Sequence, residues 1–178
     1  IAQDVDAAAL FGVIERVEDH ERAEAAWSEL LSIDATDTEA REQLMDLYRL
    51  RGDFEALNSA LLRQISLTRD PGRAEALCRR AAQNLDENFD DSERSIEAWR
   101  RVLDYAPDDG DSLRALTEHY ARSGDRRHQI AVLERRILRE TEEGKVDLGL
   151  QVAGLWAETG EHRAAAAAFE RILHWNRG

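Results

Sequence analysis

The chain has 178 residues, of which 43% are hydrophobic and 34% are charged, and its formal net charge at pH 7 is −13. This length and apolar content suffice for a folded core, and the charged fraction is typical of helices with one face in water. The negative field would repel a phosphate backbone, so generic nucleic-acid or anionic-membrane binding is not expected.

Apolar residues recur at spacings of three and four along the chain, which is typical of amphipathic helices. β-branched clusters and two-residue alternation are missing, so no strand is predicted. Pro71 and Pro107 fall at joints, and Gly52, Gly124 and Gly160 stand where a helix should end in a left-handed residue. The predicted helices are, in chain order, 2–17, 20–33, 38–51, 53–69, 72–87, 92–105, 110–123, 126–141, 145–159 and 162–175.

Two series of large residues recur about every 34 residues. The first is Trp27, Leu61, Trp99, Leu133 and Phe169, and the second is Ile14, Tyr48, Leu85, Tyr120 and Trp156. A period of this length indicates a repeat array, in which each unit is one helical hairpin that stacks on its neighbours to bury its apolar face. Short loops make the two helices of each hairpin antiparallel.

These positions resemble the tetratricopeptide repeat over essentially the whole chain, most clearly through Tyr120, Gly124, Trp156, Gly160 and Ala165. The resemblance implies an all-α fold, a right-handed superhelical array of antiparallel helix pairs. It divides a single domain, 1–178, into units 4–37, 38–71, 75–109, 110–145 and 146–178.

Three residues depart from the family pattern. Leu57 and Gln129 occupy the position of a small residue, and Glu18 replaces the turn glycine of the first unit. An all-helical array of another type, such as the half-repeats of RNA-processing proteins, is the structural alternative.

In this family the first helices of successive units line a concave groove. The resemblance therefore implies the following partner-binding residues: Glu42, Asp46, Arg79, Arg80, Gln83, Arg114, Glu118 and Arg122. One interpretation is that the arginines pair with Glu42, Asp46 and Glu118 and are neutralised. The other is a site for an acidic peptide, since arginine presents a bidentate fork to carboxylates. The dicarboxylate clamp of chaperone-binding members is not expected, because Glu42 and Asp46 replace its lysine and asparagine.

Motifs for catalysis, metals or cofactors are missing from the sequence. The five histidines, His20, His119, His128, His162 and His174, lack metal-ligand spacing and are interpreted as surface residues. Cys78, the single cysteine, is expected to be a buried structural thiol. No metal site, no cofactor and no enzymatic activity are predicted.

One segment has the ligand spacing of a calcium loop, through Asp86, Asn88, Asp90 and Glu97. Asp91, however, stands where that loop needs glycine, and Arg94 puts a cation at a ligand position. Capping of a helix that starts near Ser92, by Asp90 or Asp91, is the preferred interpretation.

A protein–protein interaction scaffold that binds a peptide or partner protein in its groove is therefore the predicted function. The alternative is a structural spacer or self-association module that stacks through its end helices. Apolar surface is expected there from the patch Ala7–Phe11 in the first helix and from Ile172, Leu173 and Trp175 in the last. The start at Ile1 indicates a piece of a longer protein. Alanine- and arginine-rich composition is typical of a high-GC bacterial source, and a cytoplasmic location is favoured because no membrane span is predicted.

Overall fold

The structure is a computed structural model that describes the backbone of residues 7–175 and the side chains of residues 19–175. It divides into two compact units, residues 1–63 and 64–178. The division falls inside the third helix, and each unit is described by itself.

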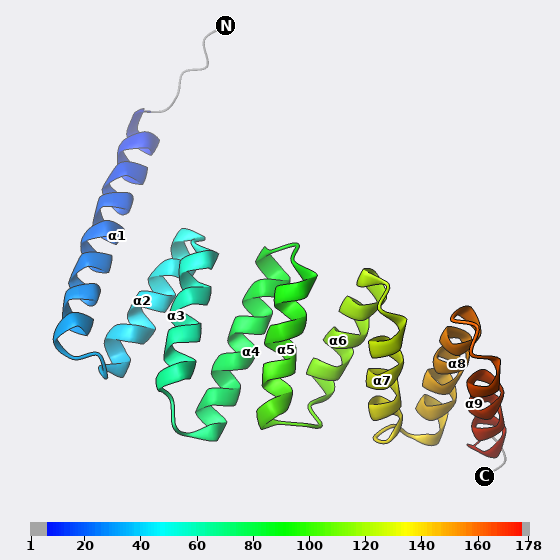
Figure 1. Cartoon of the computed structure of the whole chain (residues 1–178). Coiled ribbons are helices and arrows are strands. Elements are labelled where there is room, and N and C mark those ends of the chain that lie inside the picture. The colour runs from blue at the N-terminus through cyan, green and yellow to red at the C-terminus, as the bar shows by residue number, and fades with distance from the viewer. Residues whose placement is uncertain (1–6, 176–178) are drawn as a thin grey trace, which may run out of the picture. The chain divides into compact units, whose positions relative to one another are not determined.

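The described residues form nine helices and no strand, which confirms the all-α solenoid class (Figure 1). They are α1 (Ala7–Ile33), α2 (Thr38–Arg51), α3 (Phe54–Leu67), α4 (Pro71–Asn88), α5 (Ser92–Tyr105), α6 (Gly110–Ser123), α7 (Arg126–Ile137), α8 (Glu142–Glu158) and α9 (His162–Trp175). The predicted boundaries of α2, α5, α6 and α9 are confirmed to the residue, and those of α3, α4, α7 and α8 are within four residues.

The predicted first hairpin is wrong, because α1 runs without a break through the place where its turn was expected. The repeat period alone put a turn between residues 17 and 20. The sequence there carries neither glycine nor proline, and Glu18 is a good helix former, so nothing local ends the helix. Residues 2–6 of the predicted helix lie outside the described residues.

Aspartate side chains at the starts and glycines at the ends set most of the other helix boundaries. Carboxylates accept hydrogen bonds from backbone N–H groups in the first turn of six helices, which such caps stabilise by about 1 kcal/mol each. The capping residues are Asp37 for α2, Asp53 for α3, Asp70 for α4, Asp91 for α5, Asp109 for α6 and Asp125 for α7. Gly52, Gly124 and Gly160 adopt φ of 69°, 75° and 78°, which confirms the predicted left-handed turns.

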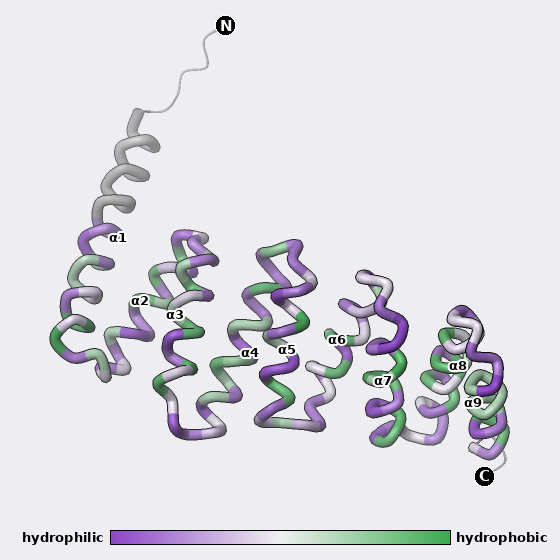
Figure 2. The backbone as a smooth tube through the Cα atoms, in the orientation of Figure 1, coloured by the Kyte–Doolittle hydropathy of each residue, from purple (hydrophilic) through white to green (hydrophobic). Residues whose placement is uncertain are grey.

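Helices α4 to α9 make the core of the second unit, in which each helix packs on the next one in the chain. Hydrophobic and hydrophilic residues alternate along each of these helices, so that each presents an apolar stripe (Figure 2). Trp99 and Leu133, from the first repeated series, are buried as predicted, and so are Leu85 and Tyr120 from the second. Leu57 in α3 and Gln129 in α7, which replace small residues, are buried as well.

Phe169 breaks this pattern. The repeat predicted a core position, but the side chain is 47% exposed. Its counterparts Trp99 and Leu133 lie on helices followed by another helix that packs against them, namely α6 and α8. Phe169 lies on α9, the last described helix, and Leu173 one turn further on is 56% exposed. Ile172, by contrast, is buried against α8.

The crossing of α8 and α9 depends on a glycine. A Cβ atom added to Gly149 would lie 2.8 Å from Cγ1 of Ile172 and 2.9 Å from Trp175, so only glycine permits this approach. Gly154, less than two turns further along α8, has nothing within 4 Å of its added Cβ atom. The two glycines of one helix thus differ completely in their steric surroundings.

In the first unit, Glu24 joins α1 to α2. The hydroxyl of Tyr48 donates to Oε1 of Glu24 at 3.3 Å, and the guanidinium of Arg51 pairs with its other carboxylate oxygen. The predicted apolar patch around Ala7–Phe11 falls on side chains outside the described residues.

Cys78 is buried, as predicted, and burial raises the pKa of its thiol. No described helix is both long enough and apolar enough to cross a membrane. Within the same residues, His, Cys, Asp and Glu side chains do not gather into any group of three that could hold a metal ion.

Candidate functional site

A groove of about 270 Å³ lies between α4 and α6, the first helices of two successive hairpins, with α5 contributing to its wall. We call it the α4–α6 groove. Its lining residues are Gln83, Asp86 and Glu87 from α4, Trp99 from α5, and Asp111, Arg114, Ala115 and Glu118 from α6. Three of the residues predicted from the sequence, Gln83, Arg114 and Glu118, therefore border one cavity.

Asp86 is held by side chains from two other helices. One carboxylate oxygen accepts the indole N–H of Trp99 at 2.7 Å, and the other lies 2.8 Å from Nε2 of His119. The Trp99 and His119 side chains are almost fully buried, whereas 28% of the Asp86 side chain is exposed. The carboxylate is thus fixed from α5 and α6 while part of it faces the groove.

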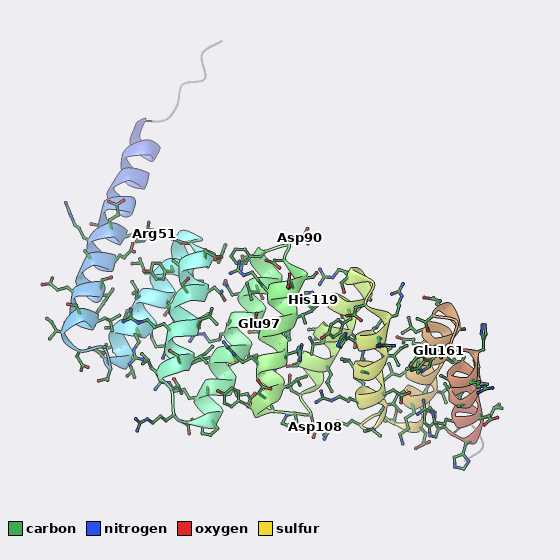
Figure 3. All side chains as sticks on the ribbon, viewed as in Figure 1. Arg51, Asp90, Glu97, Asp108, His119 and Glu161 are labelled. Atoms are coloured by element: carbon green, nitrogen blue, oxygen red, sulfur yellow. The ribbon has the colours of Figure 1, made fainter. Side chains whose placement is uncertain are left out.

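His119 is not the surface residue predicted from the sequence, because only 3% of it is exposed (labelled in Figure 3). Its Nδ1 lies 2.9 Å from the Nη2 atom of Arg122. A guanidinium can only donate, so Nδ1 accepts and the ring proton of the neutral imidazole is on Nε2, which donates to Asp86. The chain Arg122–His119–Asp86 therefore has a defined direction of hydrogen bonding.

Arg79 is held internally. Its two terminal nitrogens donate to the two carboxylate oxygens of Asp109, both at 2.9 Å, and one of them also donates to Glu75 at 2.6 Å. Burial by itself would raise the pKa of Asp109, but hydrogen bonds from Arg79 and Ser112 outweigh burial and lower it to about 2. Arg79 is therefore neutralised by Asp109 and Glu75, and the expected partners Glu42, Asp46 and Glu118 were wrong for this arginine.

Most of the other predicted residues are also engaged locally. Arg114 pairs with Asp111, one turn before it on α6, at 3.1 Å, and both side chains are largely exposed. Asp46 pairs in the same way with Arg49 at 3.4 Å on α2. Glu42 lies on α2 with Asp46, in the first unit, and Arg80 is half-buried on α4.

Gln83 and Glu118 differ from these residues. Both are exposed, and the side chain of neither forms a hydrogen bond or ion pair with another described residue. Their polar groups face the α4–α6 groove from opposite helices.

The segment with calcium-loop spacing serves as a helix cap. Asp91 accepts the backbone N–H of Arg94 at 3.0 Å and so starts α5, while Asp86 is used by Trp99 and His119. Asp90 lies in the loop between α4 and α5, and Glu97 lies within α5 (Figure 3). The capping interpretation is confirmed.

Two lining residues of the groove, Asp86 and Trp99, were missed as candidate site residues, and so was the buried His119, which holds Asp86. The sequence alone indicates a calcium-loop spacing for Asp86, a packing role for Trp99 and a surface position for His119. A usable signal was present for His119, because it follows Leu116 by three residues and so borders the apolar stripe of its helix.

Comparison with known proteins supports the fold alone. No protein-family model and no curated protein matches the sequence. Among solved structures, a crystal structure of MamA is 18% identical with a TM-score of 0.51, covering 99% of this chain and 97% of that one. YrrB, described as a TPR protein with an unusual peptide-binding site, is 12% identical with a TM-score of 0.50, covering 92% and 81%. At such low identity these likenesses define a tetratricopeptide-like helical solenoid and nothing finer.

Proposed function

We propose that this protein is an interaction scaffold that binds an extended peptide or a peptide-like segment of a partner protein in the α4–α6 groove. The observation that carries the proposal is a recessed surface, on the first helices of two successive hairpins, lined by polar groups that the fold itself does not use. Gln83 and Glu118 are such groups, and Arg114 is exposed beside them. Repeat arrays of this kind use such extended surfaces for binding.

The remaining predicted residues have different roles in this proposal. Arg79 joins α4 to the start of α6 through Asp109 and sets the spacing of the groove walls, instead of meeting the ligand. Arg122 orients His119, which in turn orients Asp86. Arg80 is retained as a candidate contact at the margin of the groove, and Glu42 and Asp46 as candidate contacts of the first unit.

A groove-filling substitution tests the proposal. A phage-displayed library of 12-residue peptides is selected on the immobilised 178-residue protein, and binding of the enriched peptides is measured by fluorescence anisotropy. Ala115→Trp, which places an indole in the groove, is expected to abolish binding. Ala131→Trp, an exposed alanine on α7 that does not line the groove, is the matched control and should bind like the parent protein. Binding that survives Ala115→Trp would refute the proposal.

A second function, self-association through α9, the last described helix, is favoured by one observation. Phe169 and Leu173 leave an apolar strip on α9 that is 47% and 56% exposed, although their counterparts in earlier hairpins are covered. Repeat arrays usually present a polar face at their ends. Size-exclusion chromatography with light scattering tests this idea. A dimer that Phe169→Glu dissociates, and that the control Leu138→Glu leaves intact, would support it, and a monomer at high concentration would exclude it.

A further inference from the structure

We propose that the α4–α6 groove selects a cationic side chain, the guanidinium of arginine or the ammonium of lysine, and docks it against the carboxylate of Asp86. This rests on the proposed function, since it names the peptide chemistry that the same groove would take. It is opposite in charge to the acidic peptide considered from the sequence.

Asp86 is the centre of the argument. Both groups that orient it are neutral donors, the indole N–H of Trp99 at 2.7 Å and Nε2–H of His119 at 2.8 Å. His119 is neutral because Arg122 donates to its Nδ1, leaving the single ring proton on Nε2. Asp86 is therefore held in one orientation without a cation beside it, and its charge is left for a ligand in the groove.

The ionisable side chains that line the groove carry a net negative charge. Four carboxylates border the groove, those of Asp86, Glu87, Asp111 and Glu118, against the single guanidinium of Arg114. That guanidinium is already paired with Asp111 at 3.1 Å. The carboxylates of Asp86, Glu87 and Glu118 therefore lack a cationic partner among the described residues, so they would attract a cationic ligand and repel an anionic one.

The arginines closest to the predicted anion site are engaged elsewhere. Arg79 donates to Asp109 and Glu75, and Arg122 donates to His119. Reaching a bound carboxylate would require Arg79 to give up two ion pairs. Charge complementarity thus favours a cation in the groove.

The size of the site fits one side chain. Its volume of about 270 Å³ lies just below the range of roughly 300–1,000 Å³ typical of pockets for drug-sized ligands. Arginine is expected to bind better than lysine, because its planar fork can share two hydrogen bonds with one carboxylate.

Three fluorescein-labelled peptides test this inference on the 178-residue protein by fluorescence anisotropy. The first is Gly-Ser-Arg-Ser-Arg-Ser-Gly, the second replaces both arginines by the neutral isostere citrulline, and the third replaces them by glutamate. The arginine peptide is expected to bind at least about tenfold more tightly than the citrulline peptide at low salt, and the preference should shrink as salt rises.

Charge-neutral variants locate the interaction. Glu87→Gln with Glu118→Gln leaves Asp86 and its partners untouched and is expected to weaken the arginine peptide at least about fivefold. Glu161→Gln with Glu170→Gln changes the net charge equally at exposed sites outside the groove and should have less than about a twofold effect.

A nuclear magnetic resonance measurement reports directly on Asp86. The indole N–H of Trp99 donates to Asp86, so its signal should shift when the arginine peptide binds, while those of Trp27, Trp156 and Trp175 should not. Trp99→Phe assigns the signal.

Equal binding of the arginine and citrulline peptides, equal weakening by the two double variants, or preference for the glutamate peptide would each overturn the inference. A Trp99 shift produced by the neutral or acidic peptide would overturn the inference while supporting the groove itself. No shift with the 12-residue peptides selected from the library or with these three would overturn both.

Discussion

The ion pair between Arg79 and Asp109 leads to a prediction about acid stability. The carboxylate of Asp109 caps α6 by accepting the backbone N–H of Ser112 at 2.8 Å. It also accepts hydrogen bonds from both terminal nitrogens of Arg79. Only 17% of its side chain is exposed, so solvent screens the pair weakly. Asp109→Asn keeps a residue that can cap a helix but removes the charge, so the substitution isolates the ion pair.

The magnitude follows from the pKa of Asp109, about 2 in the folded protein against an ordinary value of 3.8. A depressed folded pKa contributes stability that is present above the unfolded value and is lost as pH falls through the folded one. The difference corresponds to about 2 kcal/mol at pH 7 and roughly 1 kcal/mol at pH 3. Asp109→Asn should therefore cost about 2 kcal/mol at neutral pH and about half of that at pH 3.

Urea unfolding followed by circular dichroism at both pH values measures the effect. Asp111→Asn is the matched control, because Asp111 lies two residues away in an exposed pair and should contribute less than about 1 kcal/mol at either pH. A penalty for Asp109→Asn that stays the same between pH 7 and pH 3, or that equals the penalty for Asp111→Asn, would refute the reasoning.

Two further predictions concern packing and reactivity. Gly149→Ala should destabilise the protein by about 1 to 3 kcal/mol, because the new Cβ atom meets Ile172 and Trp175, whereas Gly154→Ala should stabilise it by about 0.5 to 1 kcal/mol through helix propensity. Thermal unfolding of the two variants checks this pair, and similar melting temperatures would contradict it. Cys78 should react with Ellman's reagent at pH 8 far more slowly than free cysteine and become fully reactive in urea, because the native thiol is buried with a raised pKa. Rapid labelling of the folded protein would show that α4 opens readily.

Most helix boundaries could be predicted because the sequence marks them locally. Aspartates at the starts and glycines at the ends act within one turn, and no tertiary information is needed to read them. The prediction of a first hairpin was wrong for the complementary reason. The repeat period predicted a turn between residues 17 and 20, where the sequence has no glycine or proline to end the helix. The predicted burial of Phe169 was wrong because this position is covered by the helix that follows, and no helix is described after α9.

The candidate groove was predictable only in part. Family resemblance brought Gln83, Arg114 and Glu118 together, since positions one repeat apart lie on adjacent first helices. The pairing of His119 with Asp86, 33 residues apart, depends on side-chain directions that a single sequence does not contain. The ion pair of Arg79 was equally hidden, because its partner Asp109 lies 30 residues further along the chain, between two predicted helices.

The close packing within the second unit joins helices that follow one another in the chain, and its longest side-chain links reach one hairpin further, from α4 to α6 and from α7 to α9. Because the contacts are local in sequence, little chain entropy is lost when each loop closes. This unit should therefore fold quickly, starting from any point along its length. They also mean that a force applied at its two ends acts on one interface at a time. Under tension the hairpins would yield in succession, and the chain would lengthen in steps of one repeat while the remaining hairpins stayed folded.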